Sequence, residues 1–329
     1  DDQGLERWRL TTVGDLAVPR SEAKVPYAFE GNYVRAAGHL LLVVLGNRFA
    51  VVDGLGDNQH PHVLWTRNLF EGKTGIQPRI IRLNGARPGR PGWFKMTDPS
   101  GRPIGHVGTF GSGLVSYQVG TALQAADPLN GQVLWNRSGL PRGSRIHGAD
   151  GFVFVEPTDR NEVLVLDAAD GAAVATRTLP TRGEIIARMG RFVVTRRVLD
   201  QKQIVAALDL ISGQTPFTME VRGDLLPVAA ENGDLAVLEL GGRFVLVNPA
   251  TGQRRIDAPL GPLDDCSGFH LLETPERFLL MVNRPSNVRV RGTSNRAIPV
   301  HGRAWAFAKA VDRTAGPILR PAWGPVTIE

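Results

Sequence analysis

The chain has 329 residues, 42% of them hydrophobic, and a formal net charge of +6. Its longest purely apolar run, Leu40 to Leu45, is far shorter than the roughly 20 residues that a membrane-spanning helix needs, so no span is expected. Arginine outnumbers lysine 33 to 5 and is spread along the whole chain. This bias is typical of a GC-rich genome, so the basic charge does not by itself indicate nucleic-acid binding. The single cysteine, Cys266, excludes an internal disulfide framework.

Five positions mark an internal repeat, because an acidic or amide residue is followed four positions later by glycine at the end of a short apolar run. The first three intervals are 40, 42 and 39 residues, a period typical of four-stranded propeller blades. In each turn we expect the first side chain to accept hydrogen bonds from backbone amides and the glycine to supply a positive φ. The pairs are Asp127/Gly131, Asp167/Gly171, Asp209/Gly213, Asn248/Gly252 and Asp312/Gly316.

The fold class expected from this repeat is an all-β propeller of antiparallel four-stranded blades. The 38 glycines and 23 prolines supply many tight turns, and no helical periodicity is sustained. We expect residues 1–329 to form a single propeller domain with six recognisable units between Val34 and Trp323.

In chain order, the first predicted element is a strand at Leu5 to Leu10, with Trp8 in its middle. The first recognisable unit follows, with Ala50 to Val52 as its third strand and Trp65 after a longer turn. Residues 70–105 are an insertion, because the repeat spacing stretches to 74 residues between Asp53 and Asp127. An insertion of this kind is expected to project as a loop from one rim or face of the scaffold.

The next units contain the clearest copies of the repeat. Gly105, Gly108, Gly111 and Gly113 precede a strand rather than a helix and lack the Gly-Lys-Ser/Thr ending, so they predict a turn and not a phosphate loop. In the copy that spans Ile185 to Glu220, two tight turns and one polar stretch separate four strands.

The third strands are apolar at nearly every position, which predicts burial on both faces between neighbouring sheets. A large ring four places after the glycine, Trp135 or Phe217, is expected to fill the space between blades. The third strands are Ala50–Val52, Val163–Leu166, Val205–Leu208, Phe244–Val247 and Ala304–Ala308.

A second insertion, residues 283–303, interrupts the unit before Asp312. Ile318 to Trp323 is then expected to be the fourth strand of the sixth unit, and Val326 to Glu329 to start another. Two arrangements fit these ends. Either a seventh, incomplete blade continues beyond Glu329 in a longer polypeptide, or the terminal strands pair and close the ring.

The stretch from Leu123 to Trp135 resembles the repeat of the pyrroloquinoline-quinone-like (PQQ-like) propeller family: a small-apolar strand, Asp, three residues, Gly, then Trp. Weaker copies extend the resemblance across most of the chain, but Ala175, Ile256 or Arg320 replaces the tryptophan. The family includes quinone-dependent alcohol dehydrogenases and non-enzymatic members, among them a periplasmic lipoprotein propeller that assists outer-membrane protein assembly. The resemblance implies the fold, while function has to be argued from the site.

The two insertions are the candidate partner-binding elements, since both are dense in arginine and the first also carries an aromatic pair. Solvated arginines in a loop, or burial of the pair against the propeller, would give the same sequence pattern. The candidate residues are Arg82, Arg87, Arg90, Trp93 and Phe94 in the first insertion and Arg289, Arg291 and Arg296 in the second.

Little in the sequence indicates catalysis. No cofactor is expected, because the adjacent cysteines that usually accompany the quinone are missing, and His60-Pro61-His62 is typical of an exposed turn rather than a metal site. We therefore expect a non-catalytic scaffold that binds a protein partner in the periplasm or cell envelope, or in a secreted form. The alternative is a quinoprotein-type oxidoreductase or a hydrolase with a site in the central channel.

Overall fold

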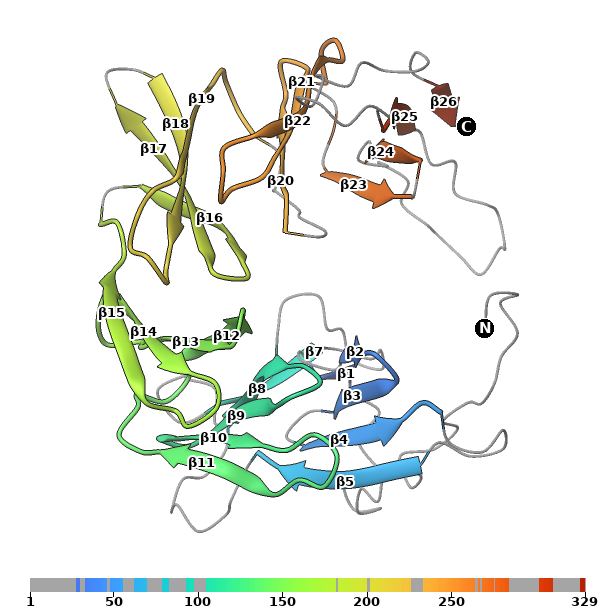
Figure 1. Cartoon of the computed structure of the whole chain (residues 1–329). Helices are drawn as coiled ribbons and strands as arrows, with labels where there is room; N and C mark the ends of the chain where they lie inside the picture. Colours follow the sequence, from blue (N-terminus) through green and yellow to red (C-terminus); the bar gives the residue numbers. More distant parts are fainter. Residues whose placement is uncertain are drawn as a thin grey trace. The chain divides into compact units, whose positions relative to one another are not determined.

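The computed structural model of the chain is built from strands and turns (Figure 1). All regular secondary structure of the described residues is β-strand, which confirms the all-β class, and none of them forms a helix long and apolar enough to cross a membrane. The chain divides into two compact units, residues 1–179 and 180–329, and the single domain stays a prediction. The structure describes residues 28–29, 33–45, 48–55, 62–69, 79–82, 93–97, 105–181, 183–199, 202–225, 233–263, 266, 268–274, 276–283, 302–309 and 326–328.

The first unit contains three four-stranded antiparallel sheets whose strands follow one another in chain order. The marked aspartate ends the third strand of each sheet or directly follows it, so the repeat predicted from the sequence corresponds to one sheet. The strands are β2 (Tyr33–Ala37), β3 (Leu40–Leu45), β4 (Arg48–Asp53) and β5 (His62–Asn68); β8 (Gly105–Phe110), β9 (Val115–Val119), β10 (Ala122–Ala126) and β11 (Val133–Arg137); and β12 (Arg145–Ala149), β13 (Phe152–Glu156), β14 (Glu162–Asp167) and β15 (Ala173–Thr178).

The second unit contains two four-stranded sheets and one three-stranded sheet, again antiparallel and in chain order. In the three-stranded sheet, the expected first strand is represented among the described residues by a single bridge between Leu225 and Glu239. The strands are β16 (Glu184–Met189), β17 (Phe192–Leu199), β18 (Lys202–Asp209) and β19 (Phe217–Val221); β20 (Leu235–Glu239), β21 (Arg243–Val247) and β22 (Arg254–Pro259); and β23 (Gly268–Glu273), β24 (Arg277–Asn283), β25 (Gly302–Ala308) and β26 (Val326–Ile328).

The repeat turns share one hydrogen-bonding pattern. In the turn that begins at Asp127, the carboxylate Oδ1 accepts a 2.7 Å bond from the backbone N–H of Leu129, and the Asp127 carbonyl accepts a 2.9 Å bond from the N–H of Gly131. Gly131 has a φ of +71°, which residues with a Cβ rarely adopt. The same pair of bonds recurs in the turns that begin at Asp167, Asp209 and Asn248. These hydrogen bonds are the ones that the sequence predicts, whereas Asp312 and Gly316 lie outside the described residues.

The predicted aromatic spacers lie between consecutive sheets. The Trp135 indole donates a 2.8 Å hydrogen bond to the carbonyl of Ala168 in the next sheet, and a Cβ added at Gly171 would lie 2.7 Å from its ring. Trp65 packs in the same way on Gly131. Gly131 and Gly171 are therefore needed for their φ and also as the flat surface on which the preceding sheet's ring rests.

The turn glycines of the second unit keep the predicted backbone conformation, but Gly252 lacks this tight packing on a tryptophan. Gly213 has a φ of +75° and Gly252 a φ of +72°, and each N–H donates a 2.8 Å bond to the carbonyl of the residue that begins its turn. A Cβ added at Gly252 would lie 4.0 Å from the Phe217 ring, an ordinary contact distance. The smaller phenylalanine ring leaves this space, so the close ring–glycine contact of Gly131 and Gly171 is not repeated at Gly252. Gly213 is exposed, and it contributes to its turn through its positive φ and its backbone hydrogen bond.

The third strands form the buried layer between sheets, as their sequences predict. β4 and β21 have every central residue buried, and β18 is buried from Val205 to Ala207. Phe217 of β19 is 4% exposed and belongs to the hydrophobic cluster that joins its sheet to β20 and β21. Burial of both faces explains why these strands lack the apolar–polar alternation of a half-exposed sheet.

The first insertion contains regular structure rather than loop alone. Its strands β6 (Arg79–Arg82) and β7 (Trp93–Thr97) pair antiparallel, and β1 (Ala28–Phe29) pairs parallel to β7. The sheets on either side of the insertion touch directly, since the rings of Phe49 and Tyr117 are 5.2 Å apart. The insertion therefore does not separate these two sheets.

The last sheet corrects one expectation. Its fourth strand is β26, which pairs with β25 so that Ala304 faces Val326 and Gly302 faces Ile328. Ile318–Trp323, expected in that role, lies outside the described residues, as does the expected strand Leu5–Leu10. The prediction placed the strand at the repeat spacing after Asp312, but the pairing begins farther along the chain.

Candidate functional site

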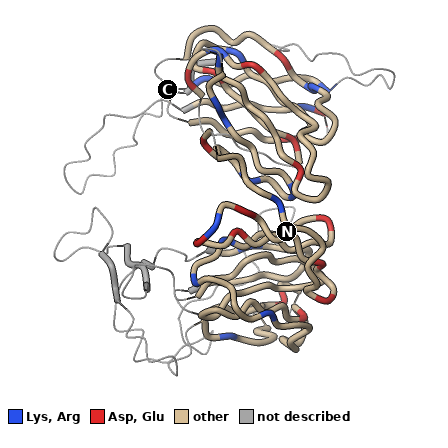
Figure 2. The backbone as a smooth tube through the Cα atoms, turned by 90° about the vertical axis from the view of Figure 1, so that its left-hand side faces the viewer, with Lys and Arg blue, Asp and Glu red and all other residues tan. Residues whose placement is uncertain are grey.

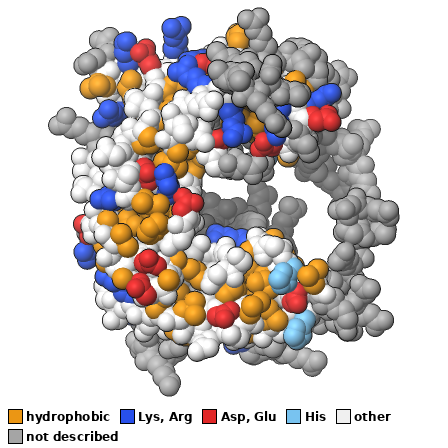
Figure 3. Space-filling view, viewed as in Figure 1, with side chains coloured by type: hydrophobic (Ala, Val, Ile, Leu, Met, Phe, Trp, Pro, Cys, Tyr) orange, Lys and Arg blue, Asp and Glu red, His pale blue; other side chains and the backbone are white. Residues whose placement is uncertain are grey.

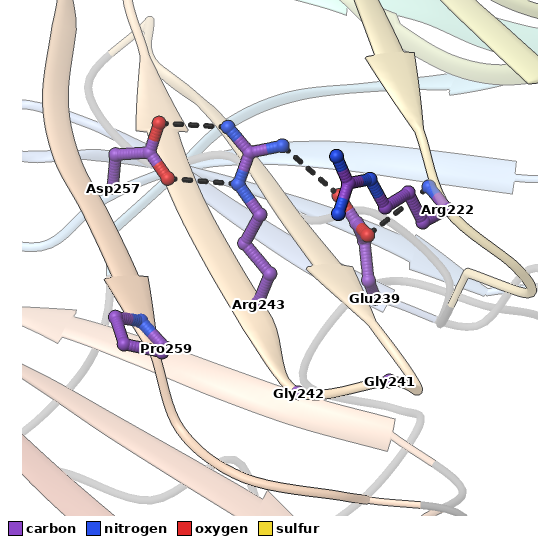
Figure 4. Close-up of a pocket in the computed structure, with 7 residues that line it drawn as sticks. All are labelled: Arg222, Glu239, Gly241, Gly242, Arg243, Asp257 and Pro259. Carbon is purple, nitrogen blue, oxygen red and sulfur yellow. Dashed lines mark hydrogen bonds and ion pairs between the residues drawn. The ribbon is translucent and has the colours of Figure 1, made fainter.

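A charged pocket of about 580 Å³ lies in the second unit beside the hairpin that joins β20 to β21. Its acidic and basic side chains come from the end of β20, the start of β21 and the middle of β22, and the backbone that follows β19 completes it (Figure 4). The lining residues are Arg222, Glu239, Gly241, Gly242, Arg243, Asp257 and Pro259.

Arg243 is the centre of this pocket. Its guanidinium donates two hydrogen bonds of 2.8 Å to the two carboxylate oxygens of Asp257 (Figure 4). The second of these oxygens also accepts a 2.7 Å bond from Arg254. The hydrogen bond from Arg243 is the main cause that lowers the pKa of Asp257, and Arg254 adds to it. The bond to Asp257 likewise raises the pKa of Arg243. Asp257 is therefore held as a carboxylate and cannot act as a proton donor near neutral pH.

Glu239 lies on the opposite side of Arg243 and is only 2% exposed. One of its oxygens accepts a 3.1 Å bond from the backbone N–H of Arg222, and the other accepts a 3.5 Å bond from Arg243. A buried carboxylate needs such partners, because an unpaired charge in the interior is costly.

The hairpin that carries this pair is fixed by close backbone packing. Gly242 has a φ of +91°, and a Cβ at this position would collide with the carbonyl of Gly261. The N–H of Leu260 also donates a 2.6 Å hydrogen bond to the Gly242 carbonyl. Only glycine fits here, so the spacing between Glu239 and Arg243 is set by the backbone.

The pocket is lined by ion pairs and backbone. None of the described residues that line it carries a hydroxyl, thiol or imidazole group, and both carboxylates are hydrogen-bonded. Arg222 is exposed and forms no ion pair with a described residue. Its guanidinium is the group that could receive an acidic side chain from outside.

A second hollow, of about 470 Å³, lies in the first unit between the β8–β11 sheet and the β12–β15 sheet. Its lining is mostly glycine, alanine and apolar side chains, and Leu134 on β11 is 47% exposed there. Three turns enclose it: the β8–β9 turn, the β12–β13 turn and the β14–β15 turn.

The residues that the sequence singled out for partner binding are only partly placed. Arg82 ends β6, and Trp93 and Phe94 begin β7, so Arg82 is paired with Phe94 across one hairpin. Arg87, Arg90, Arg289, Arg291 and Arg296 lie outside the described residues. The partner-binding role of the two insertions stays a prediction.

Neither the charged pocket nor the apolar hollow was singled out by the sequence. Glu239 could have been identified from the sequence, because it ends an otherwise apolar strand directly before a Leu-Gly-Gly turn and Arg243. A carboxylate in that position has to be buried with a partner. No sequence pattern predicts the hollow, since it is formed by turns of two different repeats.

Stacked antiparallel sheets, a shared Asp–Gly turn and aromatic spacers define the chain as a β-propeller repeat protein. A family model described as outer membrane protein assembly factor BamB matches residues 120–298, and the chain belongs to that family. No curated protein sequence matches the chain.

Solved structures that are similar to the chain have low identity. BamB from Moraxella catarrhalis is 14% identical, with 88% of this chain and 84% of that chain covered and a TM-score of 0.41. A europium-containing methanol dehydrogenase is 9% identical, with 98% and 76% covered and a TM-score of 0.42. A computationally designed protein, Ika8, is 15% identical, with 89% and 86% covered and a TM-score of 0.38. At these values the likenesses carry no information on function.

Proposed function

We propose that the chain is a non-catalytic propeller scaffold that binds protein partners in the periplasm or cell envelope of a bacterium. The observation that carries this proposal is the family match over residues 120–298, which spans more than half of the chain. The name of the family describes assembly of outer membrane proteins, and a role of that kind would place the chain in the envelope. A secreted protein is the alternative location.

The charged pocket supports binding rather than catalysis. Its carboxylates are neutralised by arginines, and the lowered pKa of Asp257 leaves it without a proton to donate. The aspartates of the repeat turns likewise hold backbone amides of their own turns. These carboxylates therefore stabilise the fold, which supports the proposal that the chain is a scaffold.

The first insertion is the docking element that we propose. It combines Arg82, Arg87 and Arg90 with the aromatic pair Trp93 and Phe94, and such a combination suits an acidic partner with an apolar pocket. The second insertion, with Arg289, Arg291 and Arg296, would add to the same electrostatic attraction.

Co-purification from the envelope fraction of the source organism tests this proposal. Replacing Arg87, Arg90 and Trp93 together with serine should abolish capture of the partner without lowering the melting temperature, and capture by the wild-type chain should weaken as salt rises. The control replaces Arg160 and Arg197, two exposed arginines of other strands and loops, and should leave capture intact. A deletion of residues 83–92 that leaves every interaction in place would contradict the proposed docking element.

A second measurement separates the scaffold from a quinoprotein enzyme. The chain is mixed with pyrroloquinoline quinone and calcium, and absorbance and melting temperature are followed. We expect no saturable shift in either. A saturable shift in both would overturn the non-catalytic assignment and favour an oxidoreductase.

A further inference from the structure

One end of the first unit is acidic, although the chain as a whole has a net charge of +6. We define the acidic end as the described residues of the turns that follow the first and third strands of the three four-stranded sheets. These residues include several aspartates and no lysine or arginine, although Arg67 and Arg137 on the neighbouring outer strands each donate a hydrogen bond to a turn carbonyl, that of Gly131 and that of Gly171. Several acidic positions lie along the right-hand edge of this unit in Figure 2. The turn residues are 38–39, 53–55, 111–114, 127–132, 150–151 and 167–172.

The acidic end is continuous across sheets. Trp65 rests on Gly131, and Trp135 rests on Gly171, so each of these two Asp–Gly turns lies against the outer strand of the preceding sheet. The apolar hollow opens among these turns, with Ala169 contributing to its wall.

One exposed apolar side chain lines the hollow, and others lie on the outer strands and turns of the same unit. Leu134 lines it, and Val133 on the same strand is 41% exposed. Leu129 in the neighbouring turn is 55% exposed, and Val174, which occupies on β15 the place of Leu134, is 56% exposed. In Figure 3, hydrophobic side chains and carboxylates gather together over the ends of the β2–β5 and β8–β11 sheets. Side chains of this kind on the surface of a scaffold suit contact with a partner.

One carboxylate lines the hollow, and a second lies one residue beyond its wall. Asp150 lines it and is exposed, with a φ of +53° in the β12–β13 turn. Asp170 follows Ala169, is exposed, and accepts a 2.7 Å bond through Oδ1 from the backbone N–H of Ala172. The side chain of Asp170 is exposed, so its negative charge is accessible to solvent.

We propose that this hollow is a docking site for a basic polypeptide segment of a partner, with one apolar side chain inserted beside Leu134 and lysine or arginine side chains placed at Asp150 and Asp170. The charge of the acidic end selects this occupant, because it attracts cations and repels acidic segments and anionic lipid surfaces. The hollow of about 470 Å³ has room for a large apolar side chain. This inference deepens the proposed scaffold function and rests on it.

Binding of short fluorescent peptides to the full chain tests the site. The first peptide carries one phenylalanine among lysines and serines, the second replaces phenylalanine with serine, and the third replaces the lysines with glutamate. We expect saturable binding of the first, binding about tenfold weaker or more for the second, and none for the third. Binding of the first peptide should also weaken as salt rises.

The variants remove charge or apolar surface without disturbing the turns. Asp170→Asn keeps an oxygen for the N–H of Ala172, because Asn130 accepts the equivalent 2.8 Å bond from Gln132 in the preceding sheet. Asp150→Asn keeps a side chain that tolerates positive φ. The double variant Asp150→Asn/Asp170→Asn should bind the first peptide about tenfold more weakly at an unchanged melting temperature.

The variant Leu134→Gln tests the apolar contact independently, and Val198→Gln, at a 72% exposed position of β17, is its matched control. Asp159→Asn/Glu220→Gln is the control for the charge change. Equal binding of all three peptides, or unchanged binding by both variants of the hollow, would overturn the inference. Sedimentation that shows self-association lost in Leu134→Gln would overturn it in favour of a second copy of the chain. If none of the peptides binds but the first insertion still captures its partner, only the docking site at the hollow is contradicted. If neither the peptides nor the partner of the first insertion binds, the proposed scaffold function is contradicted as well.

Discussion

The indole Nε1 of Trp135 donates a 2.8 Å hydrogen bond to the carbonyl oxygen of Ala168, which belongs to the next sheet. The ring also covers Gly171, so a single side chain ties the outer strand of one sheet to the turn of the following sheet. Trp65 makes the equivalent 2.8 Å bond to Pro128 one sheet earlier. Contacts between adjacent repeats of this kind contribute much of the stability of a repeat protein.

Trp135→Ala should lower the free energy of unfolding by about 3–5 kcal/mol, because it removes a large buried ring and leaves a cavity between two sheets. Trp135→Phe keeps most of the ring but leaves the Ala168 carbonyl without its donor, and should cost less, about 1–3 kcal/mol. Urea unfolding measures both. A cost below about 1 kcal/mol for Trp135→Ala would show that the two sheets are held together by other contacts.

Gly171→Ala should be destabilising for two separable reasons. Gly171 has a φ of +72°, and the added Cβ would lie 2.7 Å from the Trp135 ring. Backbone conformation alone costs about 1–2 kcal/mol in the left-handed region, and the clash adds to this.

Three other glycines provide the controls for Gly171. Gly120 has a φ of +60° with no atom within 4 Å of an added Cβ, so Gly120→Ala measures the backbone cost alone. Gly252→Ala repeats this measurement inside a repeat turn, because its added Cβ would meet only ordinary contacts. Gly111 has an open Cβ position and no positive φ, so Gly111→Ala should change stability little. Equal costs for Gly171→Ala and Gly120→Ala in thermal unfolding would mean that the tryptophan moves aside freely.

Asp127→Ala should cost about 1 kcal/mol, the typical loss when a side chain that caps backbone amides is removed. Asp127→Asn should be close to neutral, because Asn248 accepts the corresponding 2.9 Å bond from Ala250 in its own turn. The melting temperatures of the two variants check this difference. Equal destabilisation by both would indicate that the negative charge, rather than the hydrogen bond, stabilises the turn.

The repeated part of this molecule could be predicted well from the sequence. Each repeat turn is local, so Asp127 and Gly131 are enough to specify its hydrogen bonds, and the position of Trp135 follows from the same count. Sheet pairing that depends on distant segments cannot be read in this way. The parallel pairing of β1 with β7 places Ala28 opposite Trp93, and no local sequence pattern predicts this pairing.

The candidate sites were harder to predict for the same physical reason. Arg243 meets Asp257 across two strands, which requires the register of β21 and β22, and this register shifts at a bulge between Leu246 and Val247. The apolar hollow needs turns of two sheets to be placed side by side. Residue type indicates which side chains can form ion pairs or apolar contacts, but which of them meet depends on strand register and on the stacking of the sheets.

Asp234 and Asp257 should affect acid stability in opposite directions. Asp234 is 2% exposed, and burial raises its pKa, with Glu273 adding to the effect and Arg255 opposing it. Because the folded pKa lies above the unfolded one, the folded state binds more protons, and the contribution of Asp234 is present below the unfolded pKa and lost as the pH rises through the folded value. Asp234→Asn should therefore raise the free energy of unfolding at neutral pH, as measured by urea unfolding. A loss at neutral pH would mean that the 3.0 Å ion pair with Arg255 outweighs the cost of burial.

Asp257 has the opposite sign, since hydrogen bonds from Arg243 and Arg254 lower its pKa. The unfolded state then binds more protons, so this stabilisation is present above the unfolded pKa of about 3.9 and is lost as the pH falls through the lowered folded value. Asp257→Asn should cost about 2 kcal/mol at neutral pH, because it removes charge-assisted bonds to two arginines. It should also flatten the fall in stability below about pH 4, measured by urea unfolding at a series of pH values. Asp159→Asn is the matched control, since its partner Arg160 is exposed and a surface ion pair of this kind contributes little to stability. An acid profile of Asp257→Asn that runs parallel to that of the wild type would show that Asp257 is not stabilised as a carboxylate in the folded chain.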